Sequence, residues 1–192
     1  EETVNSASAL WTRNKAEITE EQYKDFYRHI SHNFDDPWLT LHFKAEGSIE
    51  YTGLLYIPST QPYDLFQPDR KQGLKLYVNR VFISDKVEEL MPSYLRFVRG
   101  VVDSPDLSLN ISREMLQHDR QLKFIAGNLE KKIKAELQKL LDNDREKYEK
   151  FFAAFGPQIK YGVLADYGAK KEALQDLLLY WSSKEGKLVS LK

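Results

Sequence analysis

Gly-Val-Val-Asp-Ser-Pro-Asp-Leu-Ser-Leu-Asn-Ile-Ser-Arg-Glu-Met-Leu-Gln, residues 100–117, joins a β-branched run to the start of a long helical pattern. The middle of this stretch is rich in Pro, Ser, Asp and Asn, which predicts a loop between a strand and a helix. Arg113 stands where the helix should begin. A helix start attracts anions through its unpaired N–H groups and its dipole, and an arginine adds a planar donor fork suited to phosphate or carboxylate. The alternative is that this arginine pairs with a nearby carboxylate, that of Asp103, Asp106 or Glu114.

Upstream of this stretch, helical and extended patterns alternate. Thr19 and Gln22 have the spacing of a capping box, and the sequence Asp35-Asp36-Pro37 ends the helical region that follows. Four residues in between have the spacing of one buried helix face: Tyr23, Phe26, Tyr27 and Ile30. The sequence therefore predicts a first helix that packs against a core.

Alternating apolar residues then predict a sheet. Residues 39–43 and 49–57 have the pattern of an antiparallel hairpin with a turn at Gly47-Ser48. We expect a third strand over residues 74–84 and a buried fourth strand over residues 98–102.

Downstream, the chain is mainly helical. One apolar stripe predicts a helix of about 27 residues after the loop, through Met115, Leu122, Ile125, Leu129, Ile133, Leu137 and Leu141. A second helix is expected over residues 144–155, stopped by Gly156-Pro157. A short apolar piece over residues 159–164 and a last helix over residues 169–181 complete the pattern.

Composition narrows the class of protein. The 192 residues are 42% hydrophobic and 30% charged, with a formal net charge of −1, so we expect a globular chain without affinity for nucleic acid. Without cysteine there can be no disulfide or thiolate metal site, which fits a cytoplasmic location. We find neither a membrane span of about 20 apolar residues nor a signal peptide. The chain starts without methionine, so we expect a piece of a longer protein.

Several longer motifs support a specific resemblance. Leu109–Gln117 is similar to the catalytic-loop signature in the middle domain of the heat-shock protein 90 chaperone family, in its bacterial HtpG type. Further blocks match in the family's order, at residues 10–14, 54–58, 63–66, 76–83 and 94–104. The resemblance covers about residues 9–181, which makes chance similarity very improbable.

The resemblance implies an α/β (α+β) fold in three parts: a larger α/β sandwich with a mixed sheet, a helical coil and a smaller α/β sandwich. We expect a lead-in segment over residues 1–14 and the larger sandwich, ending in the catalytic loop, over residues 15–112. The helical coil would span residues 113–155. Residues 156–192 would be the start of the smaller sandwich, which is truncated here.

The resemblance also implies a role in ATP hydrolysis. Arg113 matches the family arginine that reaches the γ-phosphate of ATP, which is held with Mg²⁺ by a separate N-terminal domain. Gln117 matches an assisting glutamine and lies one helical turn further on, so it shares a face with that arginine. Asn110 matches the asparagine of the motif, although its residue type favours a helix cap over contact with ATP. The chain has no phosphate-cradling Gly-x-x-x-x-Gly-Lys loop, so we expect no activity from it alone.

Other residues are assigned roles by the same resemblance. Leu107 and Leu109 would dock the loop on the core, with Phe82 as a partner. Phe34 and Trp38 would contribute to client and partner binding. The alternative for Trp38 is that it closes the edge of the core.

The residue types themselves suggest simpler roles for three other groups of side chains. Trp11 is expected to anchor the lead-in segment. Three apart on a helix, His29 and His32 lack a third ligand of evident spacing, so surface histidines are favoured over a metal site. Adjacent carboxylates such as Asp35 and Asp36 diverge in direction and are interpreted as solvated.

The expected partners are client proteins, the N-terminal ATPase domain and co-chaperones, without nucleic acid or membrane. The chain itself would be monomeric and the full-length protein a homodimer. The alternative function is a pure interaction module for clients and co-chaperones, with no role in ATP hydrolysis.

Overall fold

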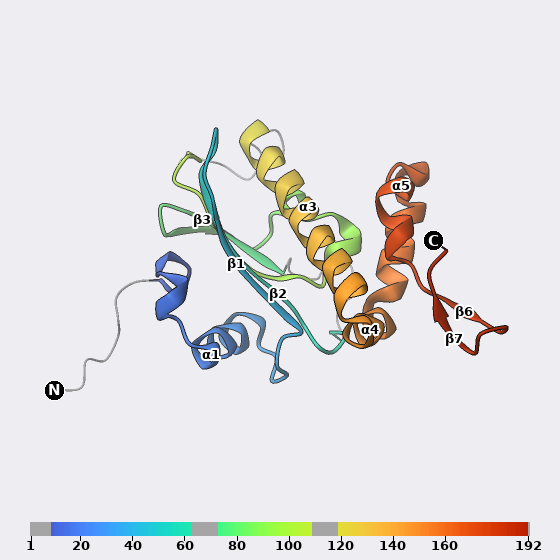
Figure 1. Ribbon diagram of the computed structural model, residues 1–192. Coiled ribbons are helices and arrows are strands. Elements are labelled where there is room, and N and C mark those ends of the chain that lie inside the picture. The colour runs from blue at the N-terminus through green and yellow to red at the C-terminus, as the bar shows by residue number, and fades with distance from the viewer. Residues whose placement is uncertain (1–8, 63–72, 109–118, 192) are drawn as a thin grey trace.

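The computed structural model describes residues 9–62, 73–108 and 119–191. A five-stranded mixed sheet lies at the centre of the larger part of the chain, with helices on both faces (Figure 1). Its order is β1 (Leu39–Ala45), β2 (Tyr51–Ile57), β5 (Arg99–Asp103), β3 (Leu74–Val78) and β4 (Val81–Ser84). All neighbours are antiparallel except β3 and β5. The α/β sandwich with a mixed sheet, predicted from the resemblance, is confirmed.

Helix α1 (Glu20–Ser31) covers one face of the sheet. The predicted capping box is present, because Thr19 and Gln22 exchange side-chain to backbone hydrogen bonds of 3.2 and 3.0 Å. The predicted inner face is also confirmed: Tyr27 is buried, and Tyr23, Phe26 and Ile30 pack partly buried around it. This smaller core includes four buried residues from elsewhere in the fold, Trp11, Leu54, Tyr56 and Val101.

Helices α3 (Arg120–Asn143) and α4 (Arg145–Leu164) cover the opposite face (Figure 1). The six described residues of the predicted α3 stripe, from Leu122 to Leu141, are all buried in the main core. The predicted start of this helix near Arg113 is wrong, because α3 begins at Arg120. Its N-cap residue is Asp119, whose side chain accepts from the backbone N–H groups of Gln121 and Leu122. Met115 lies outside the described residues. Because both faces of the sheet are covered, the central strands β2 and β5 are almost entirely buried.

The predicted third strand over residues 74–84 is wrong, because two strands meet there in a tight hairpin. Val78 pairs with Val81, and the two residues between them, Asn79 and Arg80, have left-handed φ values of 48° and 66°. Positive φ at both central positions is the geometry of the two-residue hairpin turn that matches strand twist. The backbone N–H of Arg80 donates to Asp103 Oδ1 at 3.3 Å, which helps to hold an arginine in this conformation.

The predicted end of the second helix at Gly156-Pro157 is also wrong, because α4 continues to Leu164 with Pro157 inside it. A proline in a helix removes one hydrogen bond to the carbonyl four residues earlier, here that of Ala153. Both Ala153 and Pro157 face solvent, so water can satisfy that carbonyl. The predicted separate piece at residues 159–164 is therefore the end of the same helix.

The last predicted helix, over residues 169–181, is much shorter in the structure. Helix α5 (Lys171–Leu174) and one 3-10 turn (Gln175–Leu177) are followed by the hairpin of β6 (Tyr180–Ser182) and β7 (Lys187–Val189). Three consecutive residues, Leu177 to Leu179, are all buried, which one face of a helix cannot achieve. The backbone therefore turns extended at Leu178, with φ −85° and ψ 139°.

No helix among the described residues is both long enough and apolar enough to cross a membrane.

Candidate functional site

The candidate site begins where β5 ends, at Asp103. This carboxylate is almost buried and accepts a hydrogen bond of 2.8 Å from the indole Nε1 of Trp11 through Oδ2. Its other oxygen accepts from the backbone of Arg80 in the β3–β4 turn. The lead-in segment and that turn are thus fixed to the end of β5, and the prediction that Trp11 is a docking anchor is confirmed.

The residues after Asp103 are held on both sides. The hydroxyl of Ser104, which is fully buried, donates to the Glu50 carbonyl at 2.6 Å, and its backbone N–H donates to the Tyr77 carbonyl at 3.2 Å. Asp106 Oδ2 accepts from the backbone of Glu50 at 2.6 Å. Leu107 is 4% exposed and packs in the main core. The chain therefore leaves the sheet along a fixed path up to Leu107.

A shallow hollow of about 190 Å³ lies beside this path. It is bordered by the β1–β2 and β3–β4 turns, which both lie at the end of the sheet where β5 ends. Its lining residues are Thr12, Lys44, Glu50, Tyr51, Thr52, Asn79, Arg80, Asp103 and Pro105. Lys44 is paired with Glu46 at 2.9 Å. That hydrogen bond is the main reason why the pKa of Lys44 is raised and the pKa of Glu46 is lowered. The hollow is open and mixes both signs of charge.

The residues predicted for catalysis, Asn110, Arg113 and Gln117, lie outside the described residues, as does Leu109. Phe82, predicted to meet the loop, lies on β4 and is 51% exposed. Its ring makes an edge contact with Tyr77, with ring centroids 5.6 Å apart. The described part of the predicted docking set therefore comprises one buried leucine and one half-exposed aromatic.

Phe34 and Trp38 differ sharply in their surroundings. The side chain of Phe34 is 96% exposed, at the turn between α1 and β1. Trp38 is partly buried against the main core, and Lys147 Nζ lies 5.6 Å from the centre of its ring. This environment favours the alternative that Trp38 closes the core edge, and it leaves Phe34 as the exposed aromatic of the pair.

Two residues near this turn have contacts that the sequence did not indicate. Asp35, interpreted as solvated, accepts hydrogen bonds from Tyr27 at 3.0 Å and from both polar groups of Ser59. His42, which alternation places on the polar side of its strand, lies under α1 between Tyr23 and the Trp11 carbonyl. Thr40 and His42 lie on the same face of β1, and α1 covers that face. The apolar face of the predicted first helix was the feature of the sequence that could have indicated this.

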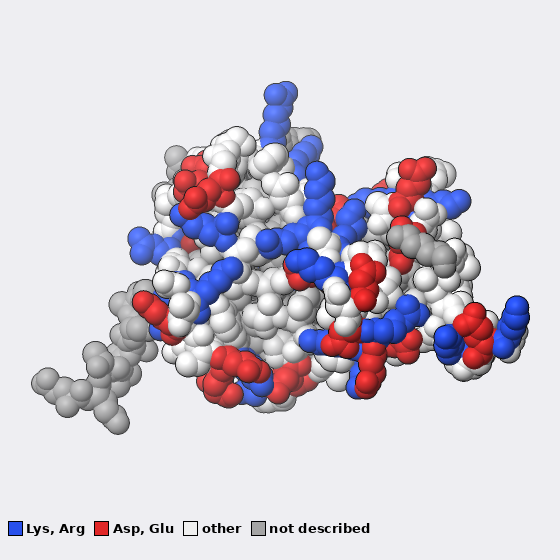
Figure 2. All heavy atoms as spheres, in the orientation of Figure 1, with Lys and Arg blue, Asp and Glu red and all other residues white. Residues whose placement is uncertain are grey.

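The histidines and carboxylates of the described segments are the candidate ligands for a metal site. His29 and His32 are both exposed, as predicted. Among the residues that the structure describes, no group of three His, Asp or Glu side chains could hold a metal ion. Figure 2 shows positive and negative side chains interspersed over the visible face, with several basic side chains along α3.

Comparison with known proteins adds a decisive observation. The profile of the Hsp90 protein family matches residues 1–192, the whole chain. The chain belongs to the Hsp90 family. Relatives include the chaperone protein HtpG of Paramagnetospirillum magneticum, 62% identical over 175 residues, and that of Bacillus subtilis, 53% identical over 191 residues. These alignments cover 91% and 100% of the chain, but only 28% and 30% of the relatives.

A solved structure identifies the corresponding part of the family. The middle domain of a putative heat shock protein of Plasmodium falciparum matches with a TM-score of 0.77 and 32% identity. The match covers 95% of this chain and 70% of that one. The chain thus has the fold of an Hsp90 middle domain of the bacterial HtpG type, and it spans about three tenths of the length of its HtpG relatives.

Proposed function

We propose that this Hsp90 middle domain binds client proteins of an ATP-dependent chaperone through Phe34. The observation that carries this proposal is the 96% exposure of a phenylalanine at a turn that follows a well-packed helix. Burying a phenylalanine side chain is worth about 1.5–3 kcal/mol, so full exposure leaves that free energy available to a partner. Non-native proteins expose apolar segments, and such a segment could bury the phenylalanine ring.

Substitution of Phe34 tests this role. We expect Phe34→Ala to weaken binding of reduced, carboxymethylated α-lactalbumin, a permanently unfolded polypeptide, by about tenfold, as loss of an interface anchor does. Tyr167→Ala is the matched control, because Tyr167 is also fully exposed but follows α4. Fluorescence anisotropy of the labelled probe measures both affinities. Equal affinity of Phe34→Ala and wild type would contradict the proposal.

The same proposal includes a share in ATP hydrolysis. Arg113 would neutralise charge that develops on the γ-phosphate of ATP, bound with Mg²⁺ by a separate N-terminal domain. Gln117 would assist, and Asn110, the asparagine of the same motif, would act as a local cap rather than contact ATP. This part is supported by the family membership and by the sequence Leu109–Gln117. The structure adds one supporting observation. Residues 103–107, which lead into this sequence, are held in place by hydrogen bonds and by the burial of Leu107.

The test is ATP turnover of the full-length protein that carries this chain. We expect Arg113→Ala to lower the turnover rate by about 10³-fold or more, as loss of an arginine finger does elsewhere. Arg120→Ala, a nearby exposed arginine on α3, is the control, and circular dichroism verifies the fold of both variants. Unchanged turnover would leave an interaction module for clients and co-chaperones with no role in hydrolysis.

The proposed assembly follows from the same family. Partners would be clients, the N-terminal ATPase domain and co-chaperones, in a cytoplasmic homodimer whose contacts lie outside this chain. Leu107, Leu109 and Phe82 would dock the catalytic loop. The proposed divisions of the chain fall at residues 14, 112 and 155, and the last of these lies inside α4, which runs from Arg145 to Leu164.

A further inference from the structure

The turn that carries Phe34 is built from an unusually dense set of polar contacts. Helix α1 ends at Ser31 and is capped by His32, which has a left-handed φ of 56°. The Ser31 hydroxyl donates to the Tyr27 carbonyl at 2.6 Å and accepts the backbone N–H of Asn33 at 3.2 Å. The backbone is therefore fixed up to the residue that precedes Phe34.

Asp35 fixes the turn from the inner side. Its Oδ1 accepts from the Tyr27 hydroxyl, whose pKa is raised mainly by burial, so the hydroxyl keeps its proton and acts as the donor. Its Oδ2 accepts from the backbone N–H and the hydroxyl of Ser59, at 3.0 and 2.9 Å, and from the backbone N–H of Thr60 at 3.3 Å. One carboxylate thus joins α1 to the segment that follows β2.

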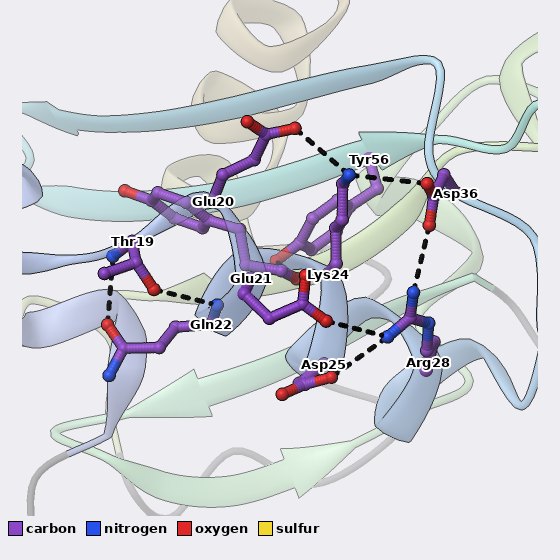
Figure 3. A network of polar contacts seen from close by, with 10 residues as sticks. Thr19, Glu20, Glu21, Gln22, Lys24, Asp25, Arg28, Asp36 and Tyr56 are labelled. Atoms are coloured by element: carbon purple, nitrogen blue, oxygen red, sulfur yellow. Dashed lines mark hydrogen bonds and ion pairs between the residues drawn. The ribbon is translucent and has the colours of Figure 1, made fainter.

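Asp36 fixes the turn from the outer side. Its two oxygens pair with Arg28 at 3.0 Å and Lys24 at 3.3 Å, and both cations extend from α1 (Figure 3). The hydrogen bond from Lys24 is the main reason why the pKa of Asp36 is low. Figure 3 shows that Lys24 and Arg28 also pair with acidic residues of the same helix, Glu20, Glu21 and Asp25.

These contacts hold the backbone on both sides of Phe34, while its ring is exposed to solvent. Ordering a flexible side chain or loop on binding costs free energy, so a segment fixed in advance binds more tightly. The cations around the turn are already paired with carboxylates, so they create little demand for a charged partner. The arrangement suits an apolar segment that buries the ring.

We propose that Asp35 is a positioning residue that holds Phe34 ready for an apolar segment of a non-native protein. This inference rests on the proposed client-binding role of Phe34. Asp35 itself does not touch the partner. Its effect on affinity passes through the orientation of the neighbouring ring.

The first test measures how firmly the backbone holds position 34. The chain has no cysteine, so Phe34→Cys gives a single site for a nitroxide spin label. We expect Asp35→Asn and Asp35→Ala to make the label more mobile in its electron paramagnetic resonance spectrum. Asp25→Asn is the matched control, since Asp25 is another carboxylate, on α1 and paired with Arg28, but makes no described contact with the turn. Unchanged mobility in both Asp35 variants would overturn the proposal.

The second test is a double-mutant cycle with carboxymethylated α-lactalbumin as the probe. We expect Asp35→Asn to weaken binding about two- to tenfold when Phe34 is present, the cost of immobilising one side chain, and to have no effect in the Phe34→Ala background. An equal loss in both backgrounds would overturn the proposal, because Asp35 would then act on the fold in general. Phe34→Ala without effect would contradict the client role instead, while the spin label would still decide the positioning role.

Discussion

At the residue scale, single polar side chains join segments that are far apart in the sequence. His42 on β1 shows this most clearly, because Nε2 lies 2.9 Å from the Trp11 carbonyl and Nδ1 lies 2.7 Å from the Tyr23 hydroxyl. A carbonyl can only accept, so Nε2 carries the proton and, in the neutral ring, Nδ1 accepts from the tyrosine. The neutral imidazole ring of His42 therefore connects the lead-in segment to α1 through two hydrogen bonds.

This geometry predicts a dependence of stability on pH. Burial lowers the pKa of His42 below its ordinary 6.5, although the hydrogen bond to Trp11 acts in the opposite direction. The unfolded chain then binds a proton more readily, so stability is fully present above pH 6.5 and is lost as the pH falls through the folded-state pKa. We expect His42→Asn to cost about 1 kcal/mol at pH 7.5 and to flatten the decline between pH 7.5 and 5.5. Urea unfolding measures this, with exposed His29→Asn as control; identical slopes in His42→Asn and wild type would refute it.

At the element scale, local patterns predicted those elements whose signals agree with their tertiary surroundings. In four places the local sequence rule and the buried face of the folded element agree. These are the capping box of α1, the β1–β2 hairpin, the buried run of β5 and the apolar stripe of α3. Gly156-Pro157 is a stop signal by local rules, yet α4 continues. The inward spacing of Phe151, Phe155 and Ile159 runs across the proline, and that packing outweighs one lost hydrogen bond.

The candidate site could be predicted only in part. The resemblance indicated Phe34, and the exposure of that residue is consistent with its proposed role. The bracing by Asp35 could not be predicted, because Ser59 and Thr60 are 24 and 25 residues away and contact it only through the fold. The hairpin turn at Asn79 and Arg80 likewise depends on Asp103, which belongs to another strand.

At the scale of the whole molecule, one polar cluster joins the helical layer to the chain that follows it. Tyr94, between the sheet and the helices, donates its hydroxyl to Glu130 on α3, and Lys170 before α5 pairs with the same carboxylate oxygen at 2.7 Å. Lys170 also lies 5.2 Å from the centre of the Tyr94 ring. Nearby, a Cβ on Gly162 of α4 would lie 2.6 Å from that ring, so the glycine permits the close approach. Three segments thus meet at one carboxylate.

Removal of that charge should loosen the junction. Burial acts to raise the pKa of Glu130, but the hydrogen bonds from Lys170 and Tyr94 together lower it below 4.5. The stabilisation is therefore present above pH 4.5 and is lost as the pH falls through the folded-state pKa. We expect Glu130→Gln to lower the free energy of unfolding at pH 7 by about 1–3 kcal/mol, and the difference from wild type to narrow toward pH 3.5. Glu136→Gln, which breaks a surface pair with Lys139 on the same helix, should cost less than about 1 kcal/mol. Denaturant unfolding at both pH values distinguishes the two, and equal effects would mean that Glu130 is no more than a surface charge.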